Sequence, residues 1–185
     1  MARNTLSRSL HDVGLAAWFG GTLANAVALN PAAGEAADPL SAGRVANVGW
    51  NRWTPVNAAA IGAHLAGSVG QLSGNKGRLV AQDGVATMSV VKTALTVVAL
   101  GATAYSRLLG RKVSKQIDVP ADSGTEPSPV TPPEVAKAQK RLAALQWVVP
   151  ATTGALLVVS SFAGEQQRDT EVQKGIAARL RRLTR

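Results

Sequence analysis

The 185-residue sequence contains no cysteine, which excludes disulfides, cysteine metal ligands and a thiol nucleophile. Aromatic residues make up only 4% of the chain, so the aromatic platforms that nucleic-acid-binding surfaces place beside their basic residues are missing. Catalytic signatures such as the P-loop, G-x-S-x-G and H-E-x-x-H are absent as well. We therefore predict no nucleic-acid binding, no enzymatic activity and no cofactor.

Charge is almost absent from four long stretches, although the chain as a whole carries a net charge of +9. All eleven acidic residues lie outside these stretches, and Lys92 is the single basic residue inside them. About 20 apolar residues in a helix cross the hydrocarbon core of a bilayer, whereas a water-soluble bundle would show a polar stripe on each helix. The sequence predicts an all-α integral membrane four-helix bundle of up-down topology, with spans at about 13–33, 54–73, 85–106 and 142–164.

The four predicted spans differ in strength, and two of them have alternative interpretations. The second is rich in Ala and Gly, which are only mildly apolar, so a re-entrant or surface segment is the alternative. The first follows Arg3 and Arg8 and ends in small residues, a pattern also found in cleaved signal peptides. We expect a multi-pass protein of the cytoplasmic membrane. Its orientation stays open, because basic residues are nearly equal in number on the two sides.

The segments outside the spans suggest a simple domain organisation. Residues 1–10 form an N-terminal tail and residues 11–165 the bundle. Residues 116–131 are rich in proline and acidic residues, which predicts a flexible linker without a core of its own. Thr131 and Glu134 form a capping-box pattern, so we expect a helix to begin there and continue into the fourth span. Residues 166–185 predict a basic amphipathic helix, with a frayed tail as the alternative.

Small residues recur along the predicted second span in a way that favours close helix packing. One row has a small residue at every fourth position, and Ala59, Ala63 and Gly67 form a second row beside it. Such rows let helices approach closely in lipid. We predict packing of the first row against the first span, through Ala58, Gly62, Ala66 and Gly70 on one side and Gly20 and Ala24 on the other.

Polar residues inside the predicted spans are the candidates for function, because an ionisable group in a membrane is costly. His64 lies near the middle of the second span. It is either a structural residue or a residue that binds a ligand or proton. A structural His64 would hydrogen bond a neighbouring helix, with Asn25, Asn57, Thr96 or Gln71 as partner. Lys92 is expected to extend toward the nearer membrane surface, since no acidic residue lies deep in a span to pair with it.

His11 is the only other histidine and, with His64, the only weak candidate for a metal ligand. It stands at the predicted mouth of the first span, so we expect it to be offset from His64 by roughly 14 Å, half a crossing at 1.5 Å per residue. This offset argues against a haem shared by the two histidines. His11 and Asp12 together supply too few ligands to specify a surface metal site.

Three segments carry resemblances to known membrane proteins. HDVGLAAWFGG, VKTALTVVALGATAYSRLLG and the terminal span resemble uncharacterised four-span membrane proteins of actinobacteria. A histidine before a W-x-G-G first span, and a third span with Lys near its start and Ser106-Arg107 at its end, more distantly resemble copper-resistance D type membrane proteins. The second resemblance implies handling of copper or another cation, with His11 and His64 as the corresponding positions.

The sequence therefore favours a non-catalytic accessory subunit that binds partners in the membrane. The expected partners are the lipid bilayer and other membrane proteins or a second copy of the chain. The alternative is a small transport or cation-handling module that uses His64. An exposed small-residue groove would favour the first interpretation, and an occluded polar cavity around His64 the second.

Overall fold

The computed structural model describes residues 4–77, 84–115, 119–165, 172–174, 176–178 and 181. Within these ranges the chain is helical, and its only strand-like pairing is an isolated bridge between Ala121 and Pro127. The first helical segment continues through a π-helical turn, η1, into a short α2. The prediction of an all-α fold is confirmed. The elements are α1 (Thr5–Ala24), η1 (Asn25–Leu29), α2 (Asn30–Ala33), α3 (Pro39–Gly74), α5 (Val85–Ser114) and α6 (Pro133–Glu165).

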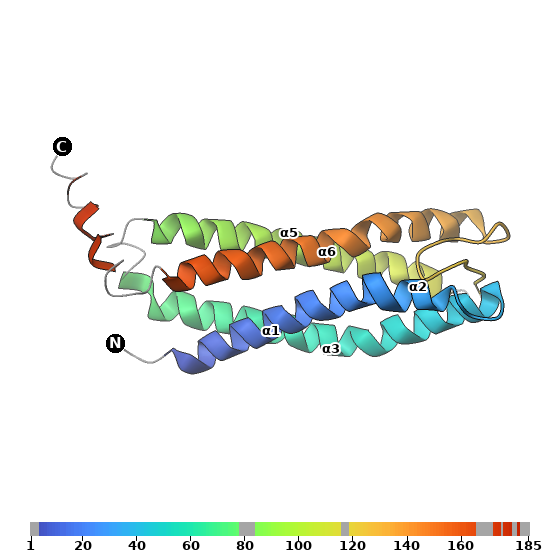
Figure 1. Cartoon of the computed structure of the whole chain (residues 1–185), viewed down its shortest axis with the longest axis horizontal. Coiled ribbons are helices and arrows are strands. Elements are labelled where there is room, and N and C mark those ends of the chain that lie inside the picture. Colours follow the sequence, from blue (N-terminus) through green and yellow to red (C-terminus); the bar gives the residue numbers. More distant parts are fainter. Residues whose placement is uncertain are drawn as a thin grey trace.

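The long helices lie side by side in one elongated bundle, and α1 begins at the same end at which α6 finishes (Figure 1). α1 packs extensively against α3, and α5 packs extensively against α6. Contact between α1 and α6 joins the two pairs, whereas α3 and α5 make few direct contacts. The bundle therefore consists of two closely packed helix pairs. The pairs are joined where α1 meets α6 and are separated between α3 and α5.

Two clusters of buried apolar side chains hold the bundle together. The first, in the middle of the helices, is built around the fully buried Leu15, Trp18 and Leu156. The second lies at the α2 end and combines α5 and α6 residues with Val119 of the connecting segment. Most other large apolar residues of α5 and α6 stay exposed, which is costly in water and favourable in lipid.

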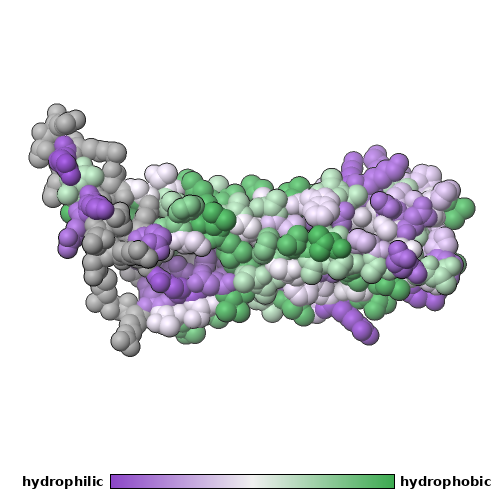
Figure 2. Space-filling view, viewed as in Figure 1, coloured by the Kyte–Doolittle hydropathy of each residue, from purple (hydrophilic) through white to green (hydrophobic). Residues whose placement is uncertain are grey.

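Three helical segments are long and apolar enough to cross a membrane: Thr5–Ala33, Val85–Ser114 and Pro133–Glu165. Figure 2 shows the corresponding surface, with hydrophobic residues concentrated around the middle of the bundle and hydrophilic ones at the α2 end. Membrane-crossing capacity is thus supported for the first, third and fourth predicted spans. The predicted second span lies within α3, which does not reach the same hydropathy because Ala and Gly dominate it.

α3 also begins well before the predicted second span. Residues 39–53 form the first half of one 36-residue helix that continues through Pro55. Asp38 caps its start by accepting hydrogen bonds from the N–H groups of Leu40 and Ser41. The hydrogen bond from the Ser41 hydroxyl, together with these N–H groups, holds the pKa of the exposed Asp38 below its usual range.

The part of the predicted linker 116–131 that the structure describes packs against the bundle. Val119 and Ala121 are buried. The Ala121 N–H donates to the Pro39 carbonyl at 3.0 Å, and the Gly124 N–H donates to the Asn30 carbonyl at 3.0 Å. Burial of these two small apolar residues, together with the two backbone hydrogen bonds, docks the segment over the end of the bundle.

α6 begins at Pro133, where the sequence predicts a helix start, but the predicted capping box does not form. The Thr131 hydroxyl donates instead to the carbonyl of Pro120 and contacts the Ser128 hydroxyl. α6 begins at Pro133, so Pro132 rather than Thr131 precedes its first residue, and the Thr131 hydroxyl is not at the capping position. Most of the predicted C-terminal amphipathic helix lies outside the described residues, and the described positions 172–174, 176–178 and 181 are helical.

Candidate functional site

The α1–α3 contact, which we call the closed seam, is the tightest helix contact in the described part of the chain. Backbone meets backbone along it, because glycines face the opposite helix where any side chain would overlap. A Cβ on Gly14 would overlap the Ala60 carbonyl and the His64 nitrogen, and one on Gly67 would overlap backbone atoms of Ser7 and His11. Gly70 and Gly74 instead face the side chains of Ser7 and Asn4. Small residues here allow the close approach that the sequence predicts between these helices.

The sequence places this contact on the wrong face of α3. Gly62 has nothing within 4 Å of an added Cβ, and Gly20 of α1 likewise faces open space. The residues Ala24, Ala58 and Ala66 are exposed, and Gly70 alone of the predicted set lies in the seam. The actual packing row of α3 is Ala60, Ala63, His64 and Gly67, so the second of the two small rows contributes, whereas the first faces outward except at Gly70.

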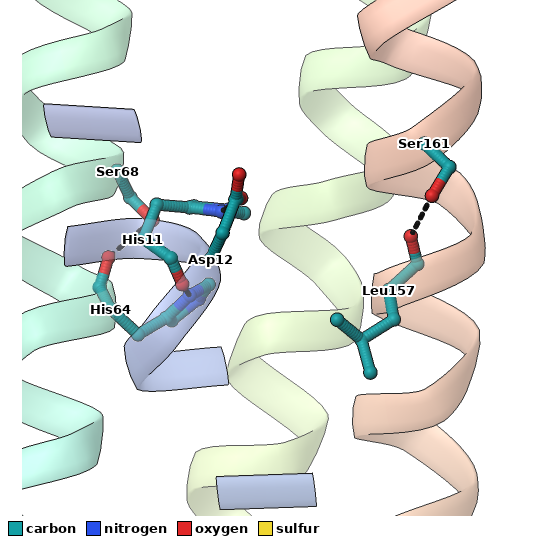
Figure 3. A network of polar contacts seen from close by, with 6 residues as sticks. All are labelled: His11, Asp12, His64, Ser68, Leu157 and Ser161. Atoms are coloured by element: carbon teal, nitrogen blue, oxygen red, sulfur yellow. Dashed lines mark hydrogen bonds and ion pairs between the residues drawn. The ribbon is translucent and has the colours of Figure 1, made fainter. Parts of the chain in front are cut away.

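His11 and His64 lie next to each other in the closed seam, which corrects the predicted separation. Their ring centroids are 4.6 Å apart, and both side chains are about 1% exposed (Figure 3). The Trp18 ring lies 6.1 Å from the His64 ring and encloses the pair from the side of the bundle centre. The prediction failed because α1 begins at Thr5, so that His11 is well inside the helix and faces the second half of α3.

Hydrogen bonds fix the orientation of both rings. His11 Nδ1 lies 2.7 Å from the Asp12 carboxylate, and His64 Nδ1 lies 3.4 Å from the His11 carbonyl oxygen (Figure 3). A neutral imidazole that donates through Nδ1 carries a bare lone pair on Nε2. Both Nε2 atoms are buried and have no hydrogen-bond partner among the described residues. The pair therefore presents two buried acceptor nitrogens.

None of the partners predicted for His64 contacts it through a hydrogen bond. Asn25 donates to the Gly21 carbonyl and Thr96 to the Lys92 carbonyl, each within its own helix. Asn57 Oδ1 and Gln71 Nε2 are buried without a partner. A backbone carbonyl of α1 takes their place, which a residue-by-residue search for polar side chains cannot find.

Lys92 of α5 interacts electrostatically with both histidine rings and with Asp12. Asp12 of α1 therefore lies within electrostatic range of Lys92, a proximity that the sequence did not suggest. The acid was missed because Asp12 lies outside the predicted first span and enters through the longer α1.

The seam limits which ligands the histidines could hold. Backbone atoms are in close contact on both sides of the pair, at Gly14 and Gly67, which leaves no space for a haem ring between the helices. In the described part of the chain no group of three or more His, Asp or Glu residues is placed to hold a metal ion. Among the described residues, the two imidazole nitrogens are the ligands available to an ion at this position.

The opposite side of α3 faces α5 across an opening, which we call the open side. Two cavities lie along it, with volumes of about 310 and 340 Å³, within the range of roughly 300–1,000 Å³ of ligand sites. The first lies toward the α2 end and the second toward the α1 start, and both touch Leu100. Sequence patterns gave no indication of these cavities, because they result from missing contact between two helices.

A buried polar network at the α2 end was also missed by the sequence. Asn30 donates to the Gln146 side-chain oxygen at 2.8 Å and accepts from the Trp50 indole at 2.9 Å. Gln146 in turn lies 3.4 Å from the Thr125 hydroxyl. The network joins α2, α3, α6 and the connecting segment beside the first cavity. Its members lie far apart in sequence, so no local pattern marks them.

No protein-family model matches the chain, and comparison with curated proteins and with solved structures gives no match.

Proposed function

We propose that the chain is a multi-pass protein of the cytoplasmic membrane in which all four long helices cross the bilayer. It acts as a non-catalytic accessory subunit that binds a partner helix. The support for a fourth crossing is the closed seam: residues 60–74 of α3 lie against residues 4–14 of α1, which belongs to a membrane-capable segment. Two helices in backbone contact share the same depth.

The observation that carries the partner-binding proposal is the uncovered small-residue surface of α3. We call it the outer face of α3, defined by Val56, Ala59, Gly62, Ala66 and Ser73, all of which are exposed. Helices in lipid associate through small residues that permit close backbone contact. This face has the composition of a helix interface, and no described segment of the chain covers it.

The absence of cysteine makes a direct test possible. Single cysteines at Gly62 and Ala66 should form cross-links to one membrane protein or to a second copy when membranes are treated with a thiol-reactive bifunctional reagent. Val158, which is 56% exposed on α6, is the matched control and should form none. Equal cross-linking at all three positions, or none at Gly62 and Ala66, would contradict a specific partner.

The second candidate function is cation handling at the histidine pair, for which the two unpartnered Nε2 atoms are the specific observation. Histidines that bind metals typically donate their other ring nitrogen to a carboxylate or backbone carbonyl, and His11 and His64 do both between them. Imidazole nitrogen suits copper, zinc and nickel. Copper is the ion implied by the resemblance to copper-resistance D type proteins.

Elemental analysis of protein purified without chelator tests this candidate. A stoichiometric ion that His11→Gln and His64→Gln both lose, while Ser68→Ala keeps it, would support cation handling. Ser68 is a suitable control because its hydroxyl bonds the His64 carbonyl but leaves both rings untouched. Equal metal content in all variants would leave the pair with a structural role only.

A further inference from the structure

The first cavity of the open side has the size and the lining of a ligand site. It lies between α3, α5 and α6, with Thr22 of α1 and Gly124 and Thr125 of the connecting segment also in contact with it. Its walls are largely apolar, with Ile61 and Leu100 at the end near the bundle centre and Val113 at the other end. A site of this size with apolar walls and few polar groups suits an amphiphilic ligand.

Three polar atoms of residues that line this cavity lack a hydrogen-bond partner. They are Trp53 Nε1, Asn57 Oδ1 and Arg107 Nε, and each atom is buried. Leaving such a group unpaired is unfavourable. Two of the three are donors, and the guanidinium also carries a positive charge. An anionic oxygen in the cavity would accept hydrogen bonds from the two donors, Trp53 Nε1 and Arg107 Nε.

Charge around the cavity favours an anion. Among the described residues that line it, Arg107 is the only ionisable one, and none is Asp or Glu. A second guanidinium nitrogen, Nη1, donates to Asn51 Oδ1 at a long 3.4 Å, and this described partner is a neutral amide. Arginine is well suited to phosphate because its planar donors match the phosphate oxygens.

The depth of these groups matches the position of a lipid headgroup. Trp50 and Trp53 line the cavity together with Arg107, Tyr105 lies two residues before Arg107 in α5, and the Arg141 guanidinium donates to the Tyr105 hydroxyl at 2.9 Å. Aromatic residues and arginines of this kind mark the boundary between headgroups and hydrocarbon. The cavity then runs from this level toward Ile61 and Leu100, where an acyl chain would lie.

We propose that this cavity binds one anionic phospholipid of the surrounding membrane. Its phosphate accepts hydrogen bonds from Arg107 and from the Trp53 indole, and an acyl chain packs along Ile61 and Leu100. The second cavity, which shares Leu100, gives the chain room to continue. The site lies on the open side rather than the outer face of α3. It depends on the membrane location of the bundle and not on a protein partner, so failed cross-linking at Gly62 would leave it intact.

Native mass spectrometry of the full chain in mild detergent provides the test, with phosphatidylglycerol as the anionic probe and phosphatidylcholine as the neutral one. One phosphatidylglycerol should bind in preference to phosphatidylcholine. Arg107→Gln should weaken it about tenfold or more, as expected for loss of a charged hydrogen bond. Arg111→Gln, one turn further along α5 and exposed, should bind as the wild type does.

Ala58→Leu offers a second variant that leaves the charge in place. Ala58 is exposed and lines the cavity, so the larger side chain should reduce lipid binding while the bundle still folds. Equal affinity for the two lipids, or unchanged binding in both Arg107→Gln and Ala58→Leu, would overturn the proposal. Displacement of the lipid by inorganic phosphate alone would overturn it as well, since it would place only a free anion at Arg107.

Discussion

The closed seam and the outer face lie on two sides of the same helix, α3, and both contain small residues. At the seam, Gly67 meets the backbone of α1 so closely that no side chain fits, whereas Gly62, five residues earlier, faces open space. The difference shows that small residues do not by themselves define a packed face. They permit contact, and the register of the neighbouring helix determines which row makes it.

The largest expected effect is the difference in stability between leucine substitutions at these two glycines. Gly67→Leu should prevent stable folding, because overpacking a core commonly costs about 1–3 kcal/mol and here backbone atoms of His11 and Ser7 stand in the way. The free energy of unfolding of Gly62→Leu should stay within about 0.5 kcal/mol of the wild-type value. Thermal unfolding followed by circular dichroism in one detergent compares them. A lower stability for Gly62→Leu than for Gly67→Leu would reverse the assignment of the two faces.

An intermediate effect is expected where the connecting segment meets the open side. Val119→Ala removes buried methyl groups and should destabilise the docked segment by about 1.5 kcal/mol, whereas Val130→Ala in the same segment should have little effect, since Val130 is 73% exposed. Limited proteolysis should therefore cut residues 119–131 faster in the first variant only. Rapid cleavage of the wild type at these residues would argue that the segment does not seal the end of the first cavity.

The smallest effect concerns the hydrogen bond that links the seam to the open side. Trp18 of α1 donates from Nε1 to the Thr103 hydroxyl of α5 at 3.3 Å. Thr103→Val keeps the shape but leaves the indole N–H unpaired, at a cost of about 1 kcal/mol. Thr93→Val is the control, because the Thr93 hydroxyl bonds only its own helix, at Ser89. Chemical denaturation should resolve the difference, and identical curves would show that the bond does not couple the two helix pairs.

The fold class and membrane-capable helices were predictable because long uncharged runs depend on composition alone. The packed face of α3 was not, since the rows through Gly62 and Gly67 are equally small and lie on neighbouring faces. The neighbouring positions of His11 and His64 depend on where α1 begins, which the uncharged run did not reveal. The cavity beside Arg107 arises from few contacts between α3 and α5, a property of the assembled bundle.

The face of α3 that packs within the bundle can be measured directly in the purified chain in a bilayer, because a chain without cysteine accepts a single spin label wherever a side chain fits. Nitroxides placed one at a time at residues 57–66 should show oxygen accessibility with a helical period. The minima should fall at Ala60 and His64 and the maxima at Ala59, Gly62 and Ala66, with little access for a water-soluble reagent throughout. Minima at Ala58, Gly62 and Ala66, or strong access for the water-soluble reagent along the whole stretch, would contradict a membrane-embedded α3 that is closed on α1 and uncovered on its outer face.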